Sequence, residues 1–209
     1  MTEPKVTYDL RVVRFDSLAI AAETNQLMAE EDIDDMTGYA ATTEDAGAKL
    51  TNAGGGGTTG LVAIAARLLH PRNIVITQVY GAITAGNVRV CGIGMSGLPT
   101  SELFALGTST ATLTGNVPFV RVNEVHVWGV TGSITTTDTF GIGTGAKLGL
   151  PMGSDCTLVD VIKEKHNFVD YAVTPANINR TYGTYTPTEA PGADHEIEIW
   201  YTVKRTLTW

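Results

Sequence analysis

Apolar and polar side chains alternate along much of this chain, a pattern that predicts β-strands with one buried face. The clearest example lies near the C-terminal end, where Ile197, Ile199, Tyr201 and Val203 alternate with charged or polar neighbours. Trp200 falls among the polar positions of that strand. A large ring on a polar face favours cover by another copy of the protein.

A second alternating run, residues 6–15, predicts a strand near the N-terminus. Its apolar positions are Val6, Tyr8, Leu10 and Val12. Asp16 or Ser17 can then cap a short helix that runs on to Met28. Residues 37–60 are small and polar and include a run of four glycines at 54–57, which disfavours regular structure.

The middle of the chain, residues 71–151, is a series of short β-type runs separated by glycines. The expected strands are residues 73–80, 87–91, 102–106, 111–114, 120–128 and 137–142. Short strands with turn signals every 8–12 residues or so indicate a sandwich or jelly roll. The alternation changes phase between Val122 and Val125, which predicts a β-bulge near Asn123.

These patterns predict a mainly β protein, an antiparallel β-sandwich or jelly roll with an N-terminal arm of strand and helix. We expect residues 1–70 to form that arm and a Gly-rich linker, and residues 71–209 to form the sandwich domain. Residues 155–165 fit either a strand or a helix, because their periodicity favours neither.

The amino-acid composition limits the classes of partner that the protein can bind. Charged residues make up 17% of the chain, below the usual share of about 25%. The net charge of −8 argues against nucleic-acid and anionic-membrane partners, since phosphates require a basic footprint. We find no apolar run long enough to span a membrane and no apolar region typical of a secretory signal. Cys91 and Cys156 are too few for a disulfide framework, so we expect the protein to fold in a reducing compartment.

Motifs that could carry catalysis are incomplete. The glycines at 141–145 precede Lys147 without the spacing of a phosphate-binding loop. Residues 94–97 resemble a nucleophile elbow, but Pro99 prevents the helix that must follow. No two histidines share a metal-ligand spacing, and His126 alternates with valines, so it is expected on the solvent side of a strand. We therefore expect no catalytic residue, no cofactor and no metal site.

Aromatic side chains gather in the last part of the chain, together with threonine and asparagine. They are Tyr171, Tyr182, Tyr185, Trp200 and Trp209. Such rings suit a sugar-stacking platform or a subunit interface. We favour the interface, because Tyr182 and Tyr185 lie in an expected loop that needs a partner to be ordered.

The middle zone also resembles a known class of proteins. Pro71-Arg72-Asn73 leads into a strand, Thr84-Ala85-Gly86-Asn87-Val88-Arg89-Val90 follows, and Lys147-Leu148-Gly149-Leu150-Pro151 closes the block. This order resembles the β-sandwich virion proteins of tailed bacteriophages over residues 71–151. Thr137-Asp138 stands where those proteins usually have Gly-Asp.

The resemblance implies a non-enzymatic virion component, such as a capsid decoration protein, a head-fibre base or a tail-associated protein. Its implied partners are further copies of itself, in a trimer or larger symmetric assembly, and a major capsid or tail protein. A carbohydrate- or receptor-binding virion module is the alternative.

Overall fold

The structure is a computed structural model, which describes residues 5–15, 23–33, 35–51, 68, 70–79, 82–151, 156–191 and 196–207. Almost all regular structure in these ranges is antiparallel β-strand. Two single-turn 3-10 segments, η2 (Glu44–Ala46) and η3 (Pro175–Asn177), are the described exceptions. The described part of the chain contains no helix that is long and apolar enough to cross a bilayer.

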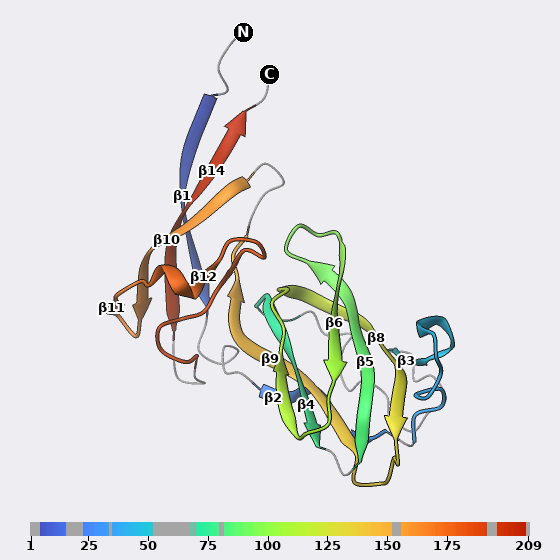
Figure 1. The fold of residues 1–209 in the computed structure, drawn as a ribbon. Helices are drawn as coiled ribbons and strands as arrows, with labels where there is room; N and C mark the ends of the chain where they lie inside the picture. The colour runs from blue at the N-terminus through green and yellow to red at the C-terminus, as the bar shows by residue number, and fades with distance from the viewer. Residues whose placement is uncertain are drawn as a thin grey trace.

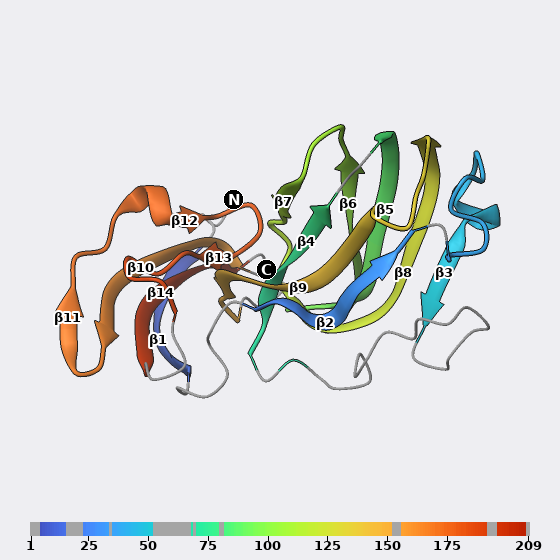
Figure 2. The ribbon, with the colours of Figure 1, turned by 90° about the horizontal axis from the view of Figure 1, so that it is seen from below.

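The largest sheet curls over itself into two layers (Figures 1 and 2). One layer has the order β2 (Glu23–Asp32), β9 (Thr139–Gly149), β4 (Arg72–Val79) and β7 (Ala111–Thr114). The other has the order β3 (Ala48–Thr51), β8 (Phe119–Gly132), β5 (Ile83–Gly94) and β6 (Pro99–Leu106). The layers meet where Arg72 pairs with Phe119.

From β2 to β9, every connection crosses from one layer to the other except the β5–β6 hairpin. This order is that of a jelly roll, in which two Greek keys fold over each other. The expected mainly β, antiparallel sandwich is therefore confirmed. Its core lies between the layers and is made by inward-facing side chains of both, among them Ile74, Ile76, Val88, Val90, Val125, Val127, Phe140 and Ile142.

The expected bulge in β8 is also confirmed. Cys91 pairs with Glu124, but the next residue, Gly92, pairs with Val122, so Asn123 is the extra residue. The bulge requires glycine at position 92, because a Cβ there would collide with the backbone oxygen of Arg121. The bulge keeps Val122 and Val125 on the buried side despite their odd spacing.

A second sheet, which we call the terminal sheet, lies beside the jelly roll (Figures 1 and 2). Its order is β1 (Lys5–Phe15), β14 (Ile197–Leu207), β10 (Cys156–His166) and β11 (Val169–Tyr171). Its inner face builds a second core with the end of β9 and with the short strand β13 (Thr184–Tyr185), which pairs with β12 (Ile178–Asn179). The alternation in β14 is confirmed, since its four expected apolar residues are all buried.

Three expectations for other segments have different outcomes. The expected helix is wrong over residues 23–28, which belong to strand β2, because Leu27 and Met28 are buried against the jelly-roll core. Its first part, residues 16–22, lies outside the described residues. Strands β2 and β3, which fall within the expected arm of residues 1–70, pair with β9 and β8 of the sandwich, and the division into an arm and a domain stays a prediction. Residues 156–166 are a strand, β10, which resolves the open choice.

Candidate functional site

The outer face of the terminal sheet exposes a row of apolar side chains. On β1, Tyr8 is 67% exposed, Leu10 59% and Val12 45%. Val12 pairs with Trp200 of β14, so the half-buried indole lies on the same face. Contiguous exposed apolar side chains on a protomer mark a surface that binds something.

The orientation of β1 is the reverse of what its alternation predicts. The apolar positions Tyr8, Leu10 and Val12 face outward, while the alternate positions Asp9 and Arg11 are half-buried. Asp9 lies 3.0 Å from Nε of Arg205, an ion pair with the neighbouring strand. A strand that turns its apolar side away from its own protomer gains stability only when a partner covers that side.

The outer edge of β1 is a second feature of this surface. Within the described ranges β14 is the only strand that pairs with β1, and their register runs unbroken from Lys5 to Phe15. An edge strand of this length presents backbone N–H and C=O groups to any strand that can pair with them. The apolar face and the free edge therefore belong to one continuous surface.

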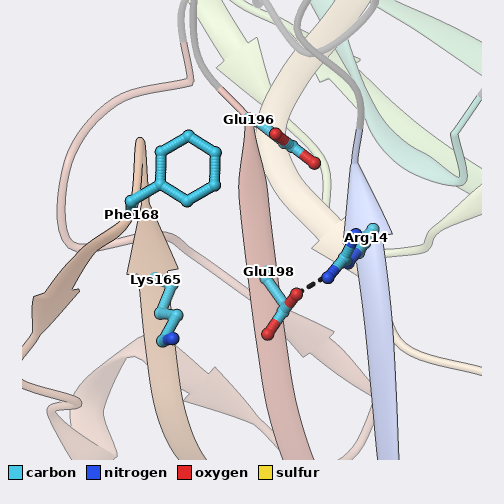
Figure 3. Close-up of a pocket in the computed structure, with 5 residues that line it drawn as sticks. All are labelled: Arg14, Lys165, Phe168, Glu196 and Glu198. Carbon is cyan, nitrogen blue, oxygen red and sulfur yellow. Dashed lines mark hydrogen bonds and ion pairs between the residues drawn. The ribbon is translucent and has the colours of Figure 1, made fainter.

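A small pocket lies at the end of the same face, between β1, β14 and the β10–β11 hairpin (Figure 3). It is lined by Arg14, Lys165, Phe168, Glu196 and Glu198. Nε of Arg14 donates to Oε2 of Glu198 at 2.6 Å. The pKa of Glu198 lies below its ordinary value, because the indole N–H of Trp200 and then Arg14 stabilise the carboxylate. The pocket therefore places charged side chains, among them the Arg14–Glu198 ion pair, around the exposed ring of Phe168.

Phe168 occupies a strained position at the tip of that hairpin. Asn167 and Phe168 have φ of 49° and 67°, the left-handed region that a two-residue type I′ turn requires at both positions. Phenylalanine is unfavourable in this conformation, and because the residue is 91% exposed, burial of its ring does not offset the strain. Strain kept at an exposed aromatic residue is typical of a binding position.

The structure separates the five aromatic residues expected at the site. Trp200 lies on the outer face of the terminal sheet, and Tyr171 pairs with Glu164, which is buried on the inner face. Tyr182 is 42% exposed in the turn between β12 and β13, where it lines a different hollow with the β5–β6 loop. Trp209 lies outside the described residues.

Tyr185 is fully buried, and its hydroxyl donates to Oε2 of Glu164. Its ring therefore belongs to the protomer core and offers no surface to a partner. Trp200, Tyr182 and Tyr185 do not form one stacking platform. Sequence reasoning missed the exposed side chains Tyr8 and Leu10, because alternation identifies the two sides of a strand without saying which one faces the core. It also missed Phe168, which lies in a turn that no glycine marks.

A polar cluster lies in the jelly roll, on the outer face of the β3-β8-β5-β6 layer. It contains Cys91, Glu124 and His126, whose ligand atoms all lie within 4.8 Å of one another. Burial and then Glu124 raise the pKa of the Cys91 thiol. The pKa of Glu124 is lowered, chiefly by the hydrogen bond from Lys49. Glu124 and His126, two residues apart on one strand face, were the signal in the sequence for this cluster.

A scan against protein-family models, a search of the curated proteins and a search of the solved structures each found no match to this chain. The strand order by itself gives the fold and not the function, since jelly rolls serve capsids, lectins and other proteins.

Proposed function

We propose that this protein is a non-enzymatic structural component of a virus particle, a capsid decoration or auxiliary protein of a tailed bacteriophage. It assembles with further copies of itself through the terminal sheet and coats a major capsid or tail protein. The observation that carries the assembly role is the outward apolar face of β1 beside its free edge. The jelly roll supports the virion role, because capsid proteins commonly use this fold.

The sequence of β1 is complementary to itself in an antiparallel arrangement. When two copies of β1 pair with Leu10 on the two-fold axis, Asp9 of each copy lies opposite Arg11 of the second copy. Tyr8 of each copy then lies opposite Val12 of the second. Opposite charges and aromatic–β-branched pairs are the favourable cross-strand neighbours in antiparallel sheets.

Such pairing is an isologous contact, in which the same patch serves both copies. It adds backbone hydrogen bonds along an edge that is otherwise free, and it joins two terminal sheets into one. It also places the exposed side chains of Tyr8, Leu10 and Val12 from both copies in one apolar band. This joined band is the surface that the capsid or tail protein covers.

A charge exchange tests this contact. We expect Asp9→Arg and Arg11→Asp each to lower the solution mass measured by light scattering, because each variant places like charges opposite one another twice. An equimolar mixture of the two variants restores both ion pairs, so it is expected to recover the mass of the wild-type assembly. Asp170→Arg, the same exchange on β11 at the far edge of the sheet, serves as the control and leaves the mass unchanged.

Wild-type protein that stays monomeric at every concentration would contradict the assembly role. Variants that assemble as well as the wild type would contradict only the β1 register. The virion role has its own test, which is co-purification of the protein with phage particles.

A further inference from the structure

We propose that Cys91, Glu124 and His126 form a binding site for a divalent transition metal ion of the zinc class, on the outer face of the β3-β8-β5-β6 layer. The site lies away from the terminal sheet and does not depend on the assembly role. It differs from the expectation of no metal site, which was based on histidine spacing alone.

Strand geometry brings the three side chains together. Cys91 of β5 pairs directly with Glu124 of β8, and His126 follows two residues later on the same strand face. Val125 between them is fully buried, so its two neighbours point outward. The three ligand atoms lie within 4.8 Å of one another. Metal–ligand bonds of about 2.0–2.3 Å in tetrahedral geometry need slightly closer atoms, which small side-chain rotations supply.

The donor set indicates which ion fits. A thiolate, an imidazole and a carboxylate are the three ligand types that zinc binds, whereas calcium and magnesium prefer oxygen alone. Beside Cys91 and Glu124 lies an open hollow, which is also lined by Asn123, Thr100 and Ser101. Solvent in this hollow can provide a fourth ligand. Three protein ligands with one open position is the arrangement that binds an exchangeable ion or its ligand.

Two of the three ligands, His126 and Glu124, also have a charged neighbour outside the site. Nε2 of His126 lies 3.1 Å from Oε1 of Glu124, while its Nδ1 lies 3.7 Å from Oε1 of Glu44. Nζ of Lys49 holds the other oxygen of Glu124 at 2.7 Å. A carboxylate that hydrogen-bonds the far imidazole nitrogen orients a metal-binding histidine and fixes its tautomer, and Glu44 forms that bond only when it moves closer than 3.7 Å.

The fold also holds that outer carboxylate in place. Glu44 begins η2, and Arg89 of β5 approaches it with Nε at 3.2 Å. Gly47, at the end of η2, lies directly on β8, where an added Cβ would come within 2.6 Å of the oxygen of Val127. Only glycine permits this approach, so the segment that carries Glu44 is held against the strand that carries His126. Coordination requires loss of the Cys91 thiol proton, which passes to solvent.

Cobalt(II) is the probe for this site, since it occupies zinc sites and its thiolate complexes absorb light. We expect the reduced Cys156→Ser protein, whose remaining cysteine is Cys91, to bind one Co²⁺ per chain. Binding would produce a thiolate-to-cobalt charge-transfer band, and Zn²⁺ would displace it. Adding Cys91→Ser to this protein should abolish the band.

The other ligands are tested in the same Cys156→Ser protein. His126→Ala and Glu124→Gln each remove a ligand and should weaken cobalt binding by at least about tenfold. Glu44→Gln removes the outer carboxylate and should also weaken binding by about tenfold or more. Glu198→Gln on the terminal sheet is the matched control and should leave the affinity unchanged. Circular dichroism verifies that each variant is folded.

Two results would overturn the proposal. One is the absence of the charge-transfer band in folded Cys156→Ser protein at several equivalents of Co²⁺. The other is a band that survives Cys91→Ser, or a cobalt affinity that His126→Ala and Glu124→Gln leave unchanged. In those cases the three residues form an ion-pair network only.

Discussion

At the scale of single residues, a buried carboxylate in the terminal sheet is the position that depends most on its hydrogen bonds. Glu164 is fully buried, and its Oε2 accepts hydrogen bonds from the Tyr185 hydroxyl and from the backbone and side chain of Thr188. Burial and the neighbouring Glu164 raise the pKa of Tyr185 well above its ordinary value. The phenol therefore remains a neutral donor to Glu164 in the folded protein.

Tyr185→Phe should lower the free energy of unfolding by about 1.5–3 kcal/mol, the usual worth of a hydrogen bond to a charged group. The folded-state pKa of Tyr185 is raised, so wild-type stability due to this group is present below the unfolded-state value of about 10 and declines above it. The variant should lack that alkaline component. Urea denaturation at neutral and alkaline pH measures both effects, with Tyr182→Phe as the surface control; equal stability of Tyr185→Phe and wild type would refute the role.

At the scale of elements, the β10–β11 hairpin shows a conflict between local propensity and exposure. Its turn requires positive φ at Asn167 and Phe168, and asparagine at the first position suits this conformation. Phenylalanine at the second position does not, and glycine would be the usual residue there. The hairpin therefore keeps an exposed ring at the rim of the pocket at the expense of its own stability.

Phe168→Gly should raise the free energy of unfolding by about 1 kcal/mol, because it removes the left-handed strain of a side chain with a Cβ. Phe168→Ala is the matched control, since it removes the ring but keeps most of that strain, and it should not stabilise the protein. Thermal and chemical unfolding of the two variants provide the comparison. Equal effects of both substitutions would show that the ring, and not the turn, sets the stability.

At the scale of the whole molecule, the described residues contain two separate hydrophobic cores. The first lies between the layers of the jelly roll, and the second lies between the terminal sheet and the end of β9. Strand β9 contributes to both, with Phe140 and Ile142 in the first and Leu148 in the second. The surface on β1 that we propose for assembly thus belongs to a sheet with its own core.

Ile199→Ala removes buried volume from the second core only, and Ile142→Ala from the first; each should cost about 2–5 kcal/mol. We expect Ile199→Ala to increase amide hydrogen exchange in β1, β10 and β14 while β5 and β8 remain protected. Ile142→Ala should expose the amides of the jelly roll. Hydrogen exchange followed by mass spectrometry distinguishes the two patterns, and uniform loss of protection in Ile199→Ala would show a single cooperative unit.

Features that depend on neighbours along the chain could be predicted from the amino-acid sequence alone. Alternation located β14 and its buried residues, a phase change located the bulge at Asn123, and short glycine-punctuated runs indicated a sandwich or jelly roll. The same local reasoning was wrong where tertiary contacts outweigh propensity: residues 23–28 have helix-like composition, but they pair with β9 and bury Leu27 and Met28.

Which side of a strand faces the core, and which strands lie together, depend on contacts that exist only in the folded protein. The outward apolar face of β1 depends on the sheet that β1 joins, although Tyr8, Leu10 and Val12 are plain in the sequence. The meeting of Cys91 with Glu124 and His126 depends on the register between β5 and β8. Alternation has a period of two and carries no information about partners, because register is set by contacts between residues distant in the chain.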